Sequence, residues 1–319
     1  MTVIKNVVFV NKNKLKPLEE YAGVKFMPFE FSLFPIDIIH YLLPLKLKFL
    51  TETFVSIEDK KINGLMSVVK TGSRKVKITR ILMGENSAKS GKLLVNYVVN
   101  AYLSKGAESF YAIVDGENLN LISMFKDALG FQNFAKEIVY KIEKKDIDFK
   151  NENFNFDYVK PMEFRDIKEV QNLINGTMFS YQKRTFMKSK TELRKDYFSK
   201  VGQYLLLDKN YDQILGYFRL QKINIQDYSL EFAIKPFFEA YAPDIIKYAE
   251  LKLSTNKNFK NLYVKLESFY SNFTQLKESF DEEYKNSHQN EIFVKTYLVQ
   301  KHTDFAFEKM VFNEATPAF

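Results

Sequence analysis

Two stretches of this chain carry the same order of hydrophobic and polar positions. In the first half, Phe54–Ile57 and Ile62–Val69 are apolar runs on either side of a charged turn, a pattern that predicts two strands joined in a hairpin. In the second half, Tyr204–Leu207 and Ile214–Leu220 flank a polar turn and predict the same hairpin. The repetition predicts two structurally related domains.

The parallel continues beyond each hairpin. Both second strands begin with Ile-x-Gly, and their glycines, Gly64 and Gly216, lie 152 positions apart. Stretches with helical spacing of apolar residues then alternate with short apolar strands. The expected elements, in pairs from the first and second halves, are third strands Lys75–Met83 and Tyr228–Ile234, helices Leu93–Ala101 and Ile245–Leu253, strands Ser109–Val114 and Leu262–Leu266, helices Asn118–Leu129 and Asn272–Tyr284, and closing strands Glu137–Ile142 and Glu291–Val299.

This order predicts an α/β (α+β) fold of two tandem domains, each a mixed, mostly antiparallel twisted sheet flanked by helices. A helix is also expected ahead of each hairpin, at Pro35–Leu43 in the first copy and after the N-cap residue Asp166 in the second. The segment 148–157 is charged and rich in asparagine, which is typical of a linker. We therefore expect domains at 1–147 and 158–319.

Composition removes several classes of site. The chain has no cysteine, which excludes disulfides, thiolate nucleophiles and cysteine-based zinc sites, and its three histidines are far apart in sequence, so no metal site is expected. The net charge of +8 raises the question of nucleic acid, but only six of the 47 basic residues are arginine, and the lysines are interspersed with acids. This pattern favours a solvated lysine-rich surface over a nucleic-acid-binding one.

The apolar runs are short throughout. None approaches the roughly 18 residues that a membrane span requires, so no membrane partner is expected. The run Val7–Val10 near the N-terminus is too short for the core of a signal peptide. We therefore expect the protein to be cytoplasmic.

The order of strands and helices resembles the GNAT superfamily of acyl-CoA-dependent N-acetyltransferases, and the whole chain looks like tandem GNAT proteins. The resemblance covers nearly the whole chain. It rests on the two Ile-x-Gly strand starts, the Val-x-Pro opening at Val159 with Asp166 behind it, Gly130–Phe131 after the second helix, and Asn118 with Phe125 seven residues later.

The resemblance implies a site for acetyl-CoA or another acyl-CoA as cosubstrate in the first copy. The free edge of the third strand at Ile81, Leu82 and Met83 would bond the pantetheine arm, and the turn and helix start that follow would bind the pyrophosphate. The turn lacks the family's glycine-rich loop, but its residues are small or basic. Alternatively, Ser87 or Ser90 simply caps the helix. The candidate pyrophosphate-binding residues are Ser87, Ala88, Lys89, Ser90, Gly91 and Lys92.

The second helix of the first copy adds two candidates, each with a structural alternative. Asn118 either contacts the CoA arm or caps its helix. Phe125 stands where the family commonly has a tyrosine that protonates the leaving thiolate, and it is either beside the ligand or part of the core. The catalytic residues stay unassigned. Four acids lie near the strand ends as possible bases or surface charges, and Arg80 either holds an acidic substrate group or forms a surface pair; the acids are Glu52, Glu58, Glu85 and Asp115.

The second copy departs further from the pattern. Its corresponding loop, Pro236–Asp244, contains no glycine, two acids and three bulky aromatic residues, so we expect it to bind no CoA.

Two functions follow for the whole chain. The first is an acyl-CoA-dependent N-acyltransferase, acting through the first copy on a small-molecule or peptide amine. The second is a non-catalytic protein of the same fold used for ligand binding or partner interaction.

Overall fold

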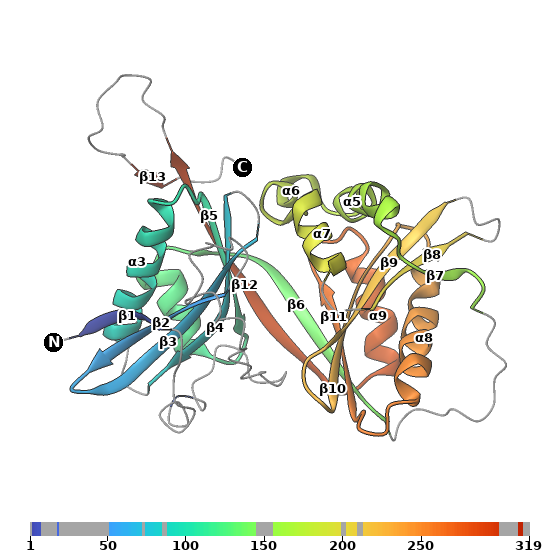
Figure 1. The fold of residues 1–319 in the computed structure, drawn as a ribbon, viewed down its shortest axis with the longest axis horizontal. Helices are drawn as coiled ribbons and strands as arrows, with labels where there is room; N and C mark the ends of the chain where they lie inside the picture. The colour runs from blue at the N-terminus through green and yellow to red at the C-terminus, as the bar shows by residue number, and fades with distance from the viewer. Residues whose placement is uncertain are drawn as a thin grey trace. The chain divides into compact units, whose positions relative to one another are not determined.

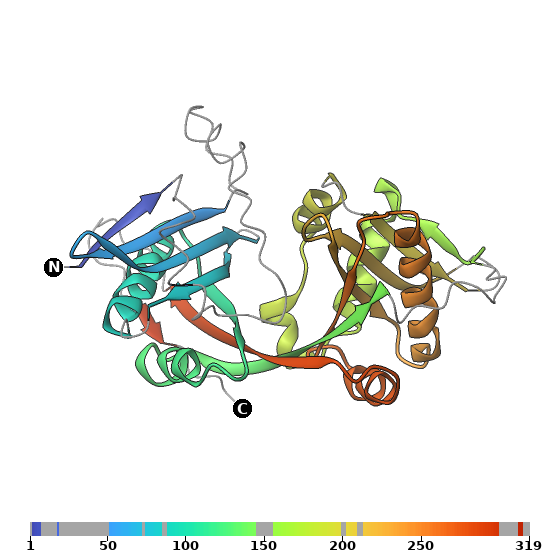
Figure 2. The ribbon, with the colours of Figure 1, turned by 90° about the horizontal axis from the view of Figure 1, so that it is seen from below.

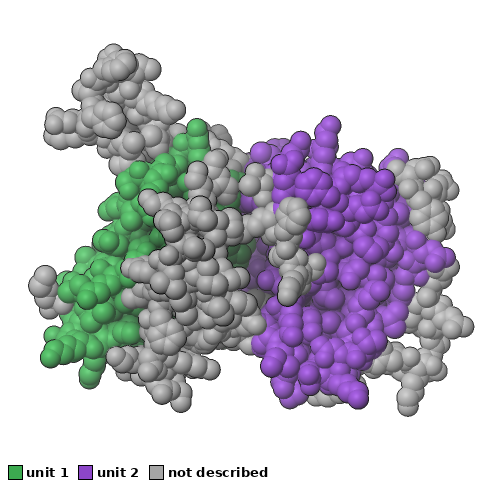
Figure 3. All heavy atoms as spheres, in the orientation of Figure 1, with its two compact units in different colours: residues 1–25, 32–134, 291–319 green, residues 26–31, 135–290 purple. Residues whose placement is uncertain are grey.

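The computed structural model describes residues 2–7, 18, 51–71, 74–84, 88–144, 156–198, 202–208, 213–299 and 312–314. The chain forms two compact units, coloured separately in Figure 3. Unit 1 comprises residues 1–25, 32–134 and 291–319, and unit 2 comprises residues 26–31 and 135–290. The expected helix at Pro35–Leu43 and most of the expected linker lie outside the described residues.

The sheet of unit 1 follows the predicted hairpin and third strand closely. Its first four strands are antiparallel neighbours in chain order, and the fourth pairs in parallel with the fifth. β1 was not predicted. The elements are β1 Val3–Val7, β2 Glu52–Glu58, β3 Lys61–Lys70, β4 Lys75–Met83, helix α3 Ala88–Leu103, β5 Ser109–Asp115, helix α4 Leu119–Ser123 and the π-helical segment η2 Met124–Ala128 (Figure 1).

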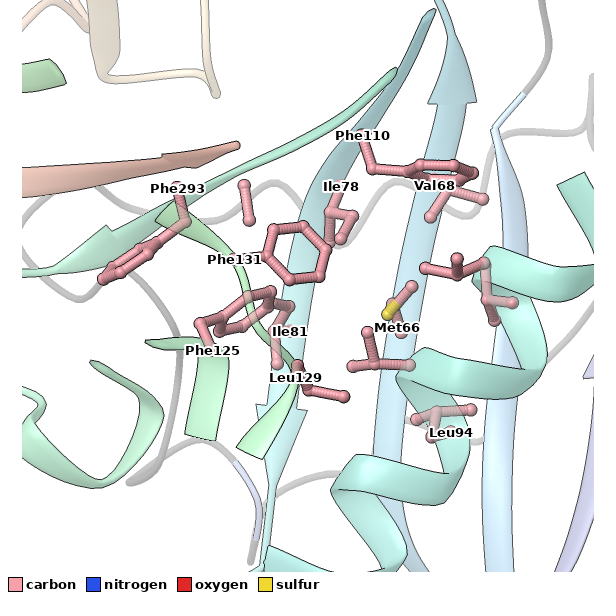
Figure 4. Close-up of a cluster of buried hydrophobic side chains, with 14 of the residues drawn as sticks. Met66, Val68, Ile78, Ile81, Leu94, Phe110, Phe125, Leu129, Phe131 and Phe293 are labelled. Atoms are coloured by element: carbon pink, nitrogen blue, oxygen red, sulfur yellow. The ribbon is translucent and has the colours of Figure 1, made fainter. Parts of the chain in front are cut away.

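The core of unit 1 lies between this sheet and helix α3. Leu94, Val95 and Val98 recur at helical spacing and are fully buried, which places one apolar stripe of α3 against the strands. The strands contribute alternate residues such as Met66 and Val68, as expected for a sheet with one face on the core (Figure 4). The predicted amphipathic pattern of α3 is therefore explained by this packing.

Unit 2 repeats the arrangement, with β8, β9 and β10 antiparallel and β10 parallel to β11. Helices α8 and α9 lie beside its strands in Figure 2, and their buried residues belong to the same core as those strands. The elements are β6 Gln132–Glu143, β7 Val159–Pro161, η4 Phe164–Asp166, α5 Ile167–Gly176, α6 Ser180–Phe186, α7 Lys190–Phe198, β8 Gly202–Leu207, β9 Ile214–Lys222, β10 Asp227–Ile234, η5 Glu239–Tyr241, α8 Ala242–Ser254, β11 Asn261–Glu267 and α9 Phe273–Glu283.

The mixed, mostly antiparallel α/β architecture predicted from the sequence is confirmed. One local expectation is corrected. Asp166 does stand at the start of α5, but its carboxylate does not cap that helix; it accepts a hydrogen bond from the backbone N–H of Glu163 at 2.9 Å and so closes the preceding short helix η4. No helix among the described segments is long and apolar enough to cross a membrane.

The closing strand of each half lies in the unit of the other half. Residues 137–143 of β6 pair with β11 inside unit 2, and Tyr140 is fully buried in that core. The last strand, β12 (Ser287–Val299), enters unit 1 at Glu291, and its Phe293 is fully buried in the core of unit 1. A short strand β13 (Phe312–Glu314) pairs with the end of β12. Each unit is therefore built from discontinuous segments, whereas continuous ranges were expected.

Candidate functional site

Strands β4 and β5 pair along only their first parts. The parallel register runs from Lys75 opposite Ser109 to Ile78 opposite Ala112. Beyond this point β4 continues to Met83 and β5 to Asp115, but the described pairing between the two strands stops. The edge of β4 that faces β5 therefore presents backbone N–H and C=O groups that the neighbouring strand does not use. An extended ligand can bond to such an edge as an added strand does.

A β-bulge in β4 coincides with the end of the pairing. The register with β3 moves from Val68 opposite Ile78 to Ser67 opposite Arg80, so Thr79 is one extra residue in β4. The Thr79 hydroxyl donates to the backbone oxygen of Ser67 at 3.1 Å, which holds the bulge in place. A bulge bends its strand and increases the local twist. This explains why β4 leaves β5 immediately after Ile78.

Helix α3 begins next to the end of β4. A Cβ atom on Gly91 would lie 2.9 Å from Sδ of Met83 and 3.1 Å from Sδ of Met124, so only glycine fits this contact without displacing a methionine. Gly91 is therefore buried inside the first turn of the helix, and its contact with a ligand stays a prediction. Its absent side chain lets the positive end of α3 sit beside the open edge of β4.

The side chains of the first turn of α3 divide into buried and exposed ones. Ser90 is buried, and its hydroxyl donates to Oε2 of Glu58 at 3.2 Å, an oxygen that also accepts from Asn63 at 3.1 Å. Lys89 and Lys92 are exposed. The first N–H groups of a helix have no intrahelical acceptor, so the backbone from Ala88 to Ser90 offers donors at this point. Ser87 and Glu85 lie outside the described residues.

Asn118 and Phe125 both have structural roles. The Oδ1 atom of Asn118 accepts the N–H of Leu121 at 3.1 Å and caps helix α4. Phe125 is fully buried, in edge-to-face contact with Phe131 at 5.0 Å and stacked on Phe293 at 5.8 Å (Figure 4). Contact of either residue with a ligand stays a prediction. Because Phe293 comes from the end of the chain, sequence reasoning about the first half missed this partner.

The acids considered as bases that the structure describes, Glu52, Glu58 and Asp115, are engaged in local contacts. The Asp115 carboxylate is buried and accepts the N–H of Glu117 at 2.9 Å in the turn after β5. Oε2 of Glu52 lies 3.5 Å from Nζ of Lys105. Glu52 also acts on Tyr102, because burial together with the Glu52 charge raises the pKa of the Tyr102 phenol above its ordinary value. These contacts single out none of the acids as a base.

Arg80 is the charged residue of β4 that directly follows the bulge residue Thr79. Its side chain is half-buried, and burial lowers the pKa of its guanidinium below the ordinary value. An arginine guanidinium stays charged at neutral pH, so Arg80 brings positive charge close to the open edge of β4.

The corresponding strands of unit 2 also separate, but other side chains close the gap. β10 and β11 pair only as far as Glu231 opposite Lys265. The buried amide of Asn272, at the start of α9, donates to the backbone oxygen of Ile234 at 3.1 Å and so occupies the edge of β10. The described register between β9 and β10 shifts nowhere, so a bulge like that of β4 is absent from this pair.

The loop before helix α8 is closed as well. The Glu239 carboxylate accepts the N–H of Phe237 at 3.1 Å, so an acidic side chain takes a donor that a phosphate would need. Pro243 stands in the first turn of α8 and has no N–H to offer. Asp244 accepts a hydrogen bond from the Tyr158 hydroxyl at 2.9 Å and places a second negative charge at this helix start. These contacts support the expectation that unit 2 binds no CoA.

Comparison with known proteins bears on the fold. No protein-family model and no curated protein matches the chain. Among solved structures, a tandem GNAT protein from the clavulanic acid biosynthesis pathway superposes with a TM-score of 0.60 at 8% identity, covering 92% of this chain and 98% of that chain. A GCN5-related N-acetyltransferase from Sphaerobacter thermophilus superposes with a TM-score of 0.58 at 9% identity, covering 92% and 95%.

The chain has a tandem GNAT fold. The two-copy organisation predicted from the repeated element order is part of that fold, and nearly the full length of each compared protein is covered. The divergence of β4 and β5 lies in unit 1 of this fold. The end of β4 and the start of α3 meet there. Asn118 and Phe125 lie on the segment that also supplies Met124 to this contact.

Proposed function

We propose that the protein is an acyl-CoA-dependent N-acyltransferase, with acetyl-CoA as the expected donor, and that unit 1 binds the acyl-CoA. The observation that carries the proposal is the divergence of β4 from β5 at the Thr79 bulge, directly beside the start of helix α3. An open strand edge suits the amide groups of a pantetheine arm, and a helix start suits a pyrophosphate. Unit 2 has its corresponding edge and loop closed by its own side chains.

The pyrophosphate is expected at the backbone donors of Ala88 to Ser90, with Lys89 and Lys92 adding positive charge. The pantetheine arm would extend along the β4 edge and place the thioester near Ile81–Met83. A backbone N–H on this edge can polarise the thioester carbonyl as the amine attacks. The C–N bond then forms as the C–S bond breaks. The products are the N-acylated amine, the CoA thiolate and one proton from the amine nitrogen.

Proton transfer to the leaving thiolate sets a chemical requirement. Phe125 has no proton to donate and is packed between two other phenylalanines. Phe125 therefore cannot protonate the thiolate, and we expect the thiolate to leave unprotonated or to receive its proton from another group, such as the acceptor amine or solvent. We expect the rate of CoA release to rise with pH through the pKa of the acceptor amine, because only the neutral amine is a nucleophile.

Isothermal titration with acetyl-CoA tests the binding site. Lys89→Glu/Lys92→Glu reverses two exposed charges at the start of α3, and each contact is worth about 1 kcal/mol, so we expect binding at least about tenfold weaker. The matched control, Lys136→Glu/Lys257→Glu, makes the same charge change at two exposed positions of unit 2 and should bind like the unchanged protein. Equal binding by both variants would place the site elsewhere.

The burial of Phe125 between Phe131 and Phe293 also favours a second function, a non-catalytic acyl-CoA-binding protein. The two functions differ in one measurement. Release of free CoA thiol from acetyl-CoA, followed with a panel of primary amines, distinguishes them once binding is established. Saturable binding without release of thiol above the background rate supports the non-catalytic function.

A further inference from the structure

The sheet of unit 1 has a second face, opposite helix α3. Beyond the bulge at Thr79, Ile81 and Met83 of β4 belong to the core that α3 covers. Because side chains alternate along a strand, Arg80 and Leu82 project from the other face. Arg80 thus lies on the face away from α3, one residue before the edge at which the thioester is proposed to bind.

Arg80 belongs to a polar row that crosses three strands on this face. Ser67 of β3 is the cross-strand neighbour of Arg80 on β4 and of Thr53 on β2. Oγ1 of Thr53 and Oγ of Ser67 lie 2.9 Å apart, and Ser67 is buried. The adjoining row on the same strands is apolar: Val55, Leu65 and Leu82. A few polar groups beside an apolar surface are typical of a site that orients a small molecule.

The charged side chains of these strands are divided between the two faces. The acids of β2, Glu52 and Glu58, contact residues of α3 or of the turn that follows it. β3 and β4 contain no acidic residue. Lys77 alternates with the core residues of β4 and shares the face of Arg80. The side chains that β3 and β4 place on this face therefore favour an anion.

The Arg80 side chain has the properties of a carboxylate-binding group. Burial lowers the pKa of its guanidinium, because the charged form has lost part of its hydration. Two parallel charge-assisted hydrogen bonds from the planar fork to a carboxylate compensate for that loss. A guanidinium has five N–H donors, so it can bind a carboxylate while other donors keep other contacts.

The packing of unit 1 sets the direction from which an acceptor approaches. The α3 side of β4 is filled by core side chains, among them Met83, Met124 and Phe125. An amine that attacks a thioester at Ile81–Met83 therefore approaches from the opposite face. Arg80 projects from that face, so it lies on the path of the acceptor.

We propose that the acceptor is a small amine that also carries a carboxylate, as an amino acid does, and that Arg80 binds this carboxylate. The inference rests on the acyl transfer proposed for unit 1. In that reaction the amine nitrogen forms a C–N bond, the C–S bond breaks and the nitrogen loses one proton. The carboxylate takes no part in these steps. Its contact with Arg80 selects the substrate and orients the nitrogen toward the thioester.

The test compares glycine, β-alanine and 4-aminobutyrate with their neutral amides, as acceptors for acetyl-CoA with the full chain. At least one acid should have a higher kcat/KM for thiol release than its amide. Arg80→Gln should lower the acid-to-amide ratio of kcat/KM at least about tenfold, a change that the different amine pKa values of acid and amide do not affect. Arg74→Gln is the matched control, because Arg74 pairs with Glu108 at 2.8 Å by the start of β4, and it should leave the ratio unchanged.

Binding measured without turnover separates this inference from the acyltransferase function. Ligand-observed NMR in the presence of CoA should show binding of an amino acid that Arg80→Gln weakens at least about tenfold and Arg74→Gln does not. Arg80→Lys keeps the charge without the fork and should weaken the same binding several-fold, even if Arg80→Gln fails to fold.

Each outcome decides one of the two proposals. Arg80-dependent binding without turnover supports the carboxylate site and contradicts the acyltransferase function. Turnover of amines with no preference for a carboxylate, or with a preference that Arg80→Gln leaves unchanged, overturns the inference and leaves that function standing. Absence of both turnover and Arg80-dependent binding also overturns the inference.

Discussion

Phe293 offers a sharp test of how the two units are assembled. It lies on the last long strand of the chain, yet it is fully buried in the core of unit 1, stacked on Phe125 at 5.8 Å. Phe293→Ala removes a buried aromatic ring that the surrounding structure cannot fully replace. Such truncations cost about 3–5 kcal/mol. We expect this loss to fall on unit 1, although the substitution is near the C-terminus.

Hydrogen exchange followed by mass spectrometry resolves the two units. In Phe293→Ala, slowly exchanging amides of β4 and α3 should exchange about 100-fold faster or more, since 1.4 kcal/mol corresponds to a tenfold change. Amides of β9 and β10 should be unaffected. Phe280→Ala is the matched control, because the Phe280 side chain is only 2% exposed and belongs to the core of unit 2. It should speed the exchange of amides in β9 and β10 and leave those of β4 and α3 unaffected.

Two results would refute this reasoning. If β4 and α3 keep their protection within about threefold in Phe293→Ala, the ring contributes less to unit 1 than its burial implies. If the loss of protection appears in β9 and β10, the closing strand belongs to the unit of its own half of the sequence. Either result would contradict the assignment of the closing strand, from Glu291 onward, to unit 1.

Three further substitutions test individual residues. Burial raises the pKa of Glu250 to about 7, so the folded protein binds its proton more tightly than the unfolded chain, and stability falls as pH rises from about 4.5 to 7. At pH 8, Glu250→Gln should therefore unfold at a higher urea concentration than the unchanged protein, because its free energy of unfolding is higher by about 1–2 kcal/mol after a discount for solvent screening. At pH 4.5 the free energies of unfolding of the two proteins should differ little. Asn118→Ala removes the cap of α4 and should lower the free energy of unfolding by about 1 kcal/mol in the same urea assay; no loss would argue against the cap. Gly216→Ala places a Cβ 3.3 Å from the backbone oxygen of Ala233 and should lower Tm, whereas Gly176→Ala, with open space around it, should not; equal shifts would contradict the packing explanation.

The candidate site was only partly predictable from the sequence. Lys89 and Lys92 were expected beside a helix start, and the structure places them exposed in the first turn of α3. Gly91 was expected for close approach of a ligand, which stays a prediction, and the structure shows in addition that it packs against Met83 and Met124. These methionines are distant in sequence from one another, so no local pattern around Gly91 could show the contact.

The bulge at Thr79 was also beyond the reach of the sequence. Nothing in the apolar pattern of Lys75–Met83 marks one residue as unpaired, because a bulge depends on the register with the neighbouring strand. The Ile-x-Gly repeat, by contrast, has a structural explanation. A side chain at Gly64 would lie 2.9 Å from the Ser56 hydroxyl, and one at Gly216 would meet the backbone of Ala233.

The sequence by itself determined the elements and their repeated order. The predicted third strand of the first copy agrees with β4 at both ends, and the helices through Leu93 and Ile245 are present. These features depend on the period of apolar residues within each segment, which a single sequence displays. Only the tertiary structure decided which unit each closing strand joins. The alternating patterns of β6 and β12 suit either core equally well, so their partners are chosen by long-range packing, in which Phe293 completes the core of unit 1 and Tyr140 that of unit 2.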